Sequence, residues 1–220
     1  MNTTENQNLM SEFREYIDKV EYGMPIVIAD VVFGLNKRQG VNINRNTVSK
    51  YLNRMVLNGE VKKFDDGIFY RTKKNKFGEI KMDYQELVKD IYLFDVKEKN
   101  VIGYRVGAVV FNEMGITDNM ENRITIVTNN RVKRKFLNKI NLKIDFKRPV
   151  NEINNENYLY FQLLDTVELI DVYHWNRLGA GKKFVNYLAS KGMEIDKLFG
   201  YAKKYYSKNV MIMLSEILAS

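Results

Sequence analysis

The sequence predicts an α+β protein with two domains, and three observations support this fold class. The chain has 220 residues, which is more than one average domain of about 100–150 residues contains. Hydrophobic residues make up 45% and charged residues 28%, a composition typical of globular proteins that bury a core. Apolar residues follow helical spacing in some segments and strict alternation in others, which indicates both helices and strands.

Three helices are predicted first. Residues 8–20 place apolar side chains on one face at helical spacing. Pro25 suits the first turn of a second helix over residues 26–35, because its missing N–H has no partner there in any case. Asn44 is a favoured N-cap residue for a third helix that ends near Leu57.

A hairpin is predicted after the third helix. Two strand-like runs cover residues 61–64 and 68–71, and Asp65-Asp66-Gly67 between them tolerates the left-handed backbone angles of a tight turn. Residues 73–78 are polar and basic, so we predict a boundary there, before a helical stretch over residues 83–94. The expected domains are therefore residues 1–81 and residues 82–220.

The order helix, helix, helix, hairpin is that of a winged helix-turn-helix, in which the third helix reads the DNA major groove. The apolar stripe of this helix predicts which residues face outward, and those residues are polar. With the basic residues of the hairpin and the segment after it, the predicted DNA-binding residues are Arg45, Asn46, Thr47, Ser49, Lys50, Asn53, Arg54, Lys62, Lys63, Arg71, Lys73 and Lys74. A protein-protein role for such a domain is the alternative.

Basic residues are concentrated in two segments. Residues 37–81 contain 12 Lys and Arg against 4 Asp and Glu, an excess that equals the net charge of +8 of the whole chain. Residues 131–148 contain 8 basic residues against one acidic residue. A localised basic stripe is typical of proteins that bind phosphate-bearing partners, although charged segments also form ordinary solvated surface.

The second domain is predicted to be mixed but mainly helical. We expect a helix over residues 103–114 that ends at Gly115, and a strand over residues 123–129. A second, half-buried strand over residues 141–147 alternates apolar and polar side chains. The remaining predicted elements are helices over residues 158–172, 182–191, 196–206 and 210–218.

Several stretches of this second domain resemble the AbiEi-type antitoxin family. Residues 101–117, VIGYRVGAVVFNEMGIT, are similar to the glycine-containing segment of that family, and residues 124–130, ITIVTNN, to its following strand. Residues 196–206 and 213–218 resemble its closing helices. The chain departs from the family pattern after Thr117, where Asp118-Asn119-Met120 replaces the usual Thr-Gln and Pro.

The resemblance implies a component of a bacterial abortive-infection toxin-antitoxin system of type IV. Its winged helix would repress its own operon by binding inverted repeats in duplex DNA, and its C-terminal domain would neutralise a nucleotidyltransferase-like toxin. A second basic patch is predicted for contact with DNA, with the toxin or with the RNA substrate of the toxin, or else as solvated surface. It comprises Arg131, Lys133, Arg134, Lys135, Lys139, Lys143, Lys147 and Arg148.

Catalytic chemistry has little support in the sequence. The chain has no cysteine and one histidine, His174, which excludes disulfides, thiol nucleophiles and zinc sites built from those residues. Asp165, Glu168 and Asp171 have a spacing that a metal-dependent nuclease could use, but we expect a solvated helix face. Gly179–Lys183 lacks the outer Gly and the final Ser or Thr of a P-loop. We therefore expect no enzyme activity, metal or cofactor.

A different kind of regulator stays open beside the antitoxin. The C-terminal domain would then sense a small molecule, as in a ligand-sensing winged-helix transcriptional regulator without a toxin partner. No run approaches the ~20 apolar residues of a membrane span. The first ten residues lack the basic and apolar parts of a signal peptide, so we expect a cytoplasmic protein without a membrane partner.

Overall fold

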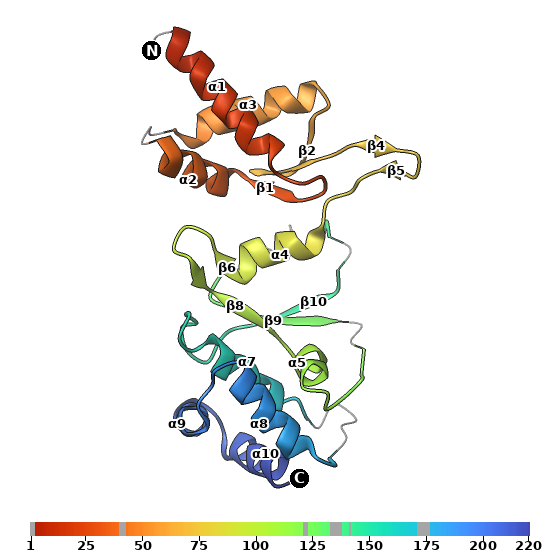
Figure 1. Ribbon diagram of the computed structural model, residues 1–220, viewed down its shortest axis with the longest axis vertical. Coiled ribbons are helices and arrows are strands. Elements are labelled where there is room, and N and C mark those ends of the chain that lie inside the picture. The colour runs from red at the N-terminus through yellow and green to blue at the C-terminus, as the bar shows by residue number, and fades with distance from the viewer. Residues whose placement is uncertain (1–2, 40–42, 121–122, 133–137, 141, 171–176) are drawn as a thin grey trace. The chain divides into compact units, whose positions relative to one another are not determined.

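A computed structural model of the protein describes residues 3–39, 43–120, 123–132, 138–140, 142–170 and 177–220 (Figure 1). The chain is α+β, with many helices and small sheets, as the sequence predicted. It forms two compact units, one that ends at Asp90 and one that begins at Ile91. No helix within the described ranges combines the length and the apolar character that a membrane span requires.

The N-terminal unit combines helices with a three-stranded antiparallel sheet of order β1-β3-β2. Apolar side chains from three helices and all three strands share one core, which includes Phe13, Ile17, Leu52 and Phe69. The elements are α1 (Thr3–Asp18), β1 (Pro25–Val27), α2 (Ile28–Gln39), α3 (Arg45–Leu57), β2 (Val61–Asp65), β3 (Ile68–Arg71), β4 (Lys74–Asn75), β5 (Gly78–Glu79) and α4 (Tyr84–Tyr92).

Pro25 does not open a helix, and that prediction is wrong. Residues Pro25–Val27 form strand β1, in which Ile26 lies opposite Phe69 of β3. β1 is an edge strand, where a proline can be accommodated without losing an interior ladder hydrogen bond. The second helix therefore begins at Ile28, two residues later than predicted. The third helix is confirmed, and the first is present but begins five residues earlier and ends two residues earlier than predicted.

The polar and basic segment predicted as a boundary after β3 is instead part of a second hairpin. β4 and β5 pair in antiparallel fashion, with Lys74 opposite Glu79. The start of α4 also belongs to the N-terminal unit, because the Asp83 N–H donates to the Gly23 carbonyl oxygen at 2.8 Å. The rings of Tyr84 and Phe64 lie 5.7 Å apart. These contacts place the division of the chain nine residues later than the sequence predicted.

The C-terminal unit places a small sheet beside a group of helices. β9 lies in the middle of the sheet of order β10-β9-β8, parallel to β10 and antiparallel to β8. The elements are β6 (Phe94–Asp95), β7 (Asn100–Val101), β8 (Gly103–Val106), α5 (Ala108–Glu113), β9 (Ile124–Thr128), β10 (Ile144–Lys147), α7 (Tyr158–Val167), α8 (Ala180–Ser190), α9 (Ile195–Tyr205) and α10 (Lys208–Ala219).

The helix predicted over residues 103–114 is instead a strand followed by a short helix. Gly103 lies opposite Thr128 in the sheet, and Tyr104 and Val106 point into the core. Gly107 has a φ of 99°, a backbone angle that favours glycine, and it separates β8 from α5. Gly103 and Gly107 therefore serve a strand and a turn instead of a helix.

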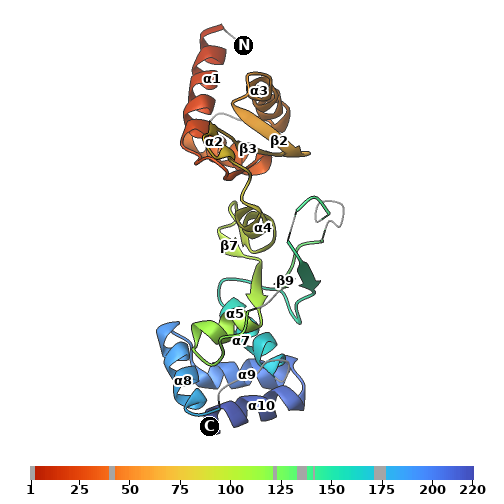
Figure 2. The ribbon, with the colours of Figure 1, turned by 90° about the vertical axis from the view of Figure 1, so that its right-hand side faces the viewer.

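Three of the four predicted C-terminal helices are confirmed within two residues at each end. The fourth, predicted over residues 158–172, ends at Val167, and residues 171 and 172 lie outside the described residues. α7, α8, α9 and α10 lie together in the C-terminal unit (Figure 2). Phe184, Leu198 and Leu214 are fully buried among them. The predicted strands at residues 123–129 and 141–147 correspond to β9 and β10, and residue 141 lies outside the described residues.

Candidate nucleic-acid interface

Helix α3 presents a polar face because most of its apolar residues are turned inward, although Leu57 at its C-terminal end is exposed. Val48, Leu52 and Met55 are buried against the rest of the N-terminal unit. Asn44 caps the helix as predicted, since its side-chain oxygen accepts a hydrogen bond of 2.9 Å from the Thr47 N–H. The cap and the buried stripe together determine which residues of α3 face water.

The outward residues of α3 are those that the sequence predicted to contact DNA. Asn46, Lys50, Asn53 and Arg54 are exposed, whereas Thr47 and Ser49 are half-buried at the flanks. Within the described part of the chain, neither Asn46 nor Lys50 makes a side-chain hydrogen bond or ion pair. Asn53 makes only a long bond of 3.4 Å to the Ser49 hydroxyl. These side chains are thus accessible to a ligand.

Arg45 connects the start of α3 to the turn between β2 and β3. Its guanidinium lies 3.7 Å from the Asp66 carboxylate, and both side chains are more than half exposed. An ion pair so exposed contributes little to stability and can exchange its partner for a phosphate. Asp66 nevertheless lowers the positive potential at this turn.

The basic residues of the two hairpins are not equivalent. Lys63, Lys73 and Lys74 are exposed, as a role in phosphate binding requires. Lys62 is also exposed, but it forms an ion pair with Glu79 of β5, and that hydrogen bond raises the pKa of Lys62 and lowers the pKa of Glu79.

Arg71 is engaged within the N-terminal unit rather than directed to solvent. Its guanidinium donates to the carbonyl oxygens of Asp18 at 2.6 Å and Val20 at 2.8 Å, close to the end of α1. It also lies 4.5 Å from the centre of the Tyr22 ring. With 16% of its side chain exposed, Arg71 connects β3 to the end of α1 and is a poor candidate for DNA contact.

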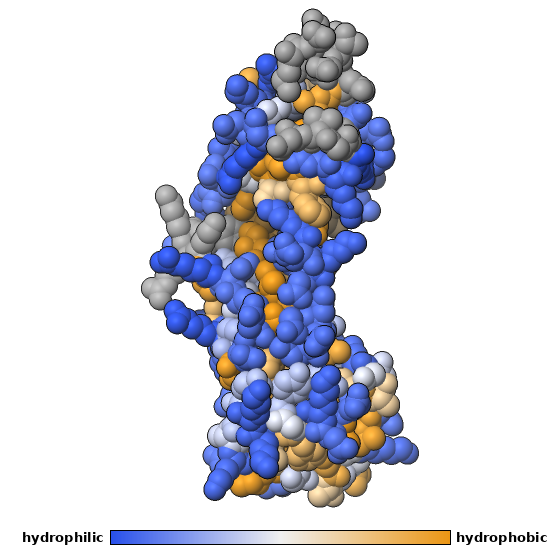
Figure 3. All heavy atoms as spheres, turned by 90° about the vertical axis from the view of Figure 1, so that its left-hand side faces the viewer, coloured by the Kyte–Doolittle hydropathy of each residue, from blue (hydrophilic) through white to orange (hydrophobic). Residues whose placement is uncertain are grey.

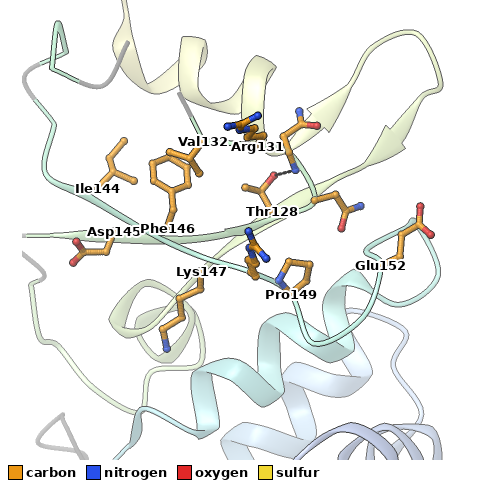
Figure 4. A pocket seen from close by; sticks show the side chains of 12 residues that line it. Thr128, Arg131, Val132, Ile144, Asp145, Phe146, Lys147, Pro149 and Glu152 are labelled. Carbon is orange, nitrogen blue, oxygen red and sulfur yellow. Dashed lines mark hydrogen bonds between the residues drawn. The ribbon is translucent and has the colours of Figure 1, made fainter. Parts of the chain in front are cut away.

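The second predicted basic patch is described only in part, because Lys133, Arg134 and Lys135 lie outside the described residues. Arg131, Lys147 and Arg148 line a hollow of about 1190 Å³ at the carboxyl ends of the parallel strands β9 and β10 (Figure 4). Lys139 and Lys143 are exposed but do not line it.

The two sides of β10 differ in character at this hollow. Figure 4 shows Ile144 and Phe146 on the opposite face of the strand from Asp145 and Lys147. The Phe146 ring packs 4.7 Å from the Tyr92 ring, whereas Asp145 accepts a hydrogen bond of 2.8 Å from Arg123. The hollow therefore combines an apolar wall with cationic side chains.

The asparagines beside the hollow have structural roles. Asn129 and the backbone of Ile153 exchange two hydrogen bonds, of 2.8 and 3.0 Å. The Asn130 amide donates to the Ile91 carbonyl oxygen at 2.7 Å. The basic side chains that line the hollow are exposed, and so are the acidic side chains of Asp145 and Glu152.

Asp165 is buried, so the expectation of a solvated acidic helix face is wrong for this residue. Its two carboxylate oxygens accept hydrogen bonds of 2.7 Å, one from the Tyr104 hydroxyl and one from the Tyr206 hydroxyl. Burial raises the pKa of Asp165, and the two hydrogen bonds act in the opposite direction. Glu168 is exposed, and Asp171 and His174 lie outside the described residues.

These contacts do not resemble a metal centre. Both oxygens of Asp165 are occupied by tyrosines, which join α7 to β8 and to the end of α9. The described residues contain no group of three acidic or histidine side chains that could hold a metal ion. Lys183 of the glycine-containing segment 179–183 donates to the Gly115 carbonyl oxygen at 2.6 Å, a contact within the C-terminal unit.

No family model matches the sequence, and no curated protein matches it. The function is therefore inferred from the residues themselves.

The sequence also contains a signal that the predicted interface left out, namely Phe77, an aromatic residue within the basic segment that follows β3. The structure places it in the short connection between β4 and β5.

Proposed function

We propose that the N-terminal unit is a winged helix that binds duplex DNA through α3, and that the protein is the antitoxin of a toxin-antitoxin pair. The accessible polar face of α3 is the observation that carries the DNA-binding part. The element order, with β1 between the first two helices and a hairpin after the third, supports a winged helix.

The residue types on α3 suit a division of tasks. Asn46, Asn53 and Arg54 can form paired hydrogen bonds with base edges, because asparagine matches adenine and arginine matches guanine. Lys50 is suited to phosphate contact, and Lys63 extends the basic character to β2. Arg71 is left out of this interface because its guanidinium already binds carbonyl oxygens near the end of α1.

Fluorescence anisotropy with duplexes from the region upstream of the gene tests this proposal. Lys50→Gln should weaken binding and reduce the slope of log affinity against log salt by about one, because one fewer phosphate is neutralised. Asn53→Ala should lower affinity for the preferred duplex more than for an unrelated one. Lys208→Gln, in the other unit, serves as the control. Unchanged DNA binding in both α3 variants would exclude α3 as the DNA-binding helix.

The antitoxin part of the proposal rests on the resemblance of residues 101–117 and 124–130 to AbiEi-type antitoxins. Those residues contribute to β8, α5 and β9 of the C-terminal unit, which would neutralise a nucleotidyltransferase-like toxin. The helices of this unit also expose apolar residues such as Val185 and Ile212. In Figure 3, apolar surface appears among polar residues at the C-terminal end of the molecule, which would give a protein partner contact area.

Bacterial growth tests the antitoxin part. The neighbouring gene is expressed alone, with the full-length protein, and with a fragment that begins at Lys81 and so keeps α4 intact. Rescue of growth by both forms would support an antitoxin whose DNA-binding unit serves regulation only. A toxic neighbour that neither form rescues, or a neighbour without toxicity, would refute the antitoxin assignment and leave the ligand-sensing regulator as the better account.

A further inference from the structure

The hairpin formed by β4 and β5 displays an aromatic ring at its tip. Asn75 lies opposite Gly78, so Lys76 and Phe77 form the connection between the strands. Phe77 is 87% exposed, although a phenylalanine side chain is among the most apolar groups in a protein. A single exposed apolar side chain is not by itself a binding site, so the conformation of the tip and the charges around Phe77 carry the argument.

The tip has a defined conformation. The Phe77 N–H donates to the Asn75 side-chain oxygen at 2.9 Å, and Gly78 has a φ of 114° that favours glycine. At the base of the hairpin, the Ile80 N–H donates to the Lys73 carbonyl oxygen at 3.1 Å. Because these bonds hold the backbone of the tip, that backbone would lose little conformational freedom on binding.

The charges around the ring indicate the chemistry of its partner. Lys73, Lys74 and Lys76 precede Phe77, and the Lys76 ammonium lies 5.1 Å from the centre of its ring. Glu79, the acidic residue of β5, is paired with Lys62. An apolar ring beside cations is complementary to the minor groove of DNA, where phosphates line both edges and stacked bases form the floor.

The hairpin continues directly from β3, which belongs to the same unit as α3. We propose that Phe77 is an apolar wedge that enters the minor groove of the DNA bound by α3 and partly unstacks one base step. Lys74 and Lys76 bind the flanking phosphates. The inserted ring bends the duplex, as apolar wedges do in architectural DNA-binding proteins. This inference rests on the proposed DNA binding and adds a second point of contact.

The test compares full-length variants on an upstream duplex that carries a donor and an acceptor dye at its two ends. Phe77→Ala should lower affinity about tenfold, within the range known for the loss of one aromatic contact with a base. It should also abolish the protein-induced change in energy transfer and leave the salt slope unchanged. Lys76→Gln should reduce the salt slope by about one and preserve the bend.

Two further variants make the result specific. Phe77→Trp should keep both affinity and bend, because an aromatic wedge remains. Met120→Ala removes an apolar side chain of the other unit that is 94% exposed, and it should change neither. Circular dichroism of each variant checks that the fold is intact, which the exposure of Phe77 favours.

The outcomes separate this inference from the proposed function. If the Phe77→Ala variant binds and bends DNA as well as the wild-type protein does, the wedge is overturned and DNA binding by α3 stays in place. Wild-type protein that binds no upstream duplex even in low salt would overturn both. If Phe77→Ala leaves DNA binding unchanged but removes binding to vesicles of mixed phosphatidylcholine and phosphatidylserine, the hairpin contacts lipid and the wedge is wrong.

Discussion

The Tyr104 hydroxyl should contribute more to stability than the Tyr206 hydroxyl, although both donate to the Asp165 carboxylate at 2.7 Å. Tyr104 is only 3% exposed, so no water can replace its hydroxyl in Tyr104→Phe, whereas Tyr206 is half-buried. Hydrogen bonds to charged groups contribute about 1.5–3 kcal/mol, and a buried acceptor left without a donor also loses its solvation. We expect a loss of about 3 kcal/mol for Tyr104→Phe and about 1 kcal/mol for Tyr206→Phe.

Urea denaturation followed by far-ultraviolet circular dichroism measures these losses. Faster hydrogen exchange in the peptide that contains α7 would assign these losses of stability to the C-terminal unit. Tyr158→Phe is the control, since the Tyr158 hydroxyl makes no side-chain hydrogen bond to the described residues, and it should change stability by less than about 0.5 kcal/mol. Equal losses for Tyr104→Phe and Tyr206→Phe, or a larger loss for Tyr206→Phe, would refute the reasoning from burial.

Three further substitutions test the packing of the two units. Burial and the carboxylates of Asp30 and Glu86 raise the pKa of Asp90 from 3.8 to about 6, so its contribution to stability is present below about pH 4 and lost as the pH rises through 6. Asp90→Asn should therefore raise the unfolding free energy by about 1 kcal/mol near pH 7.5, allowing for solvent screening, and change nothing near pH 4; thermal melts with equal shifts at both pH values would contradict this. A Cβ at Gly103 would lie 2.1 Å from the Tyr92 carbonyl oxygen, so Gly103→Ala should cost about 3 kcal/mol or more in urea denaturation. Gly200 in α9 has free space around it, and Gly200→Ala should add about 0.5–1 kcal/mol; a loss there would contradict the helix-propensity argument.

The candidate DNA-binding helix could be predicted residue by residue, because its signals are local. The N-cap Asn44 and the buried stripe through Val48, Leu52 and Met55 follow from the geometry of one helix. The outward positions of Asn46 and Lys50 follow from the same geometry. Short-range rules also predicted the turn between β2 and β3, since Gly67 has the positive φ that such a turn requires.

Predictions were wrong where two distant segments decide the local structure. Pro25 and Ile26 satisfy the local rules for a helix start, yet pairing with β3 makes them a strand. Gly103 and Val106 likewise lie in a helix-like pattern, but they form strand β8, which pairs with β9. Strand pairing depends on residues tens of positions away, so a single segment does not contain the information.

The sequence by itself determined the α+β class, most helices, the basic character of residues 37–81 and the polar face of α3. Only the tertiary structure decided which polar residues are accessible. Arg71 and Asp165 appeared to be surface groups, yet one binds carbonyl oxygens near the end of α1 and the other accepts two tyrosine hydroxyls. Phe77, an apolar residue, is instead exposed. The reason is physical: the partners that bury a polar group come from distant parts of the chain, and only folding brings them within hydrogen-bonding distance.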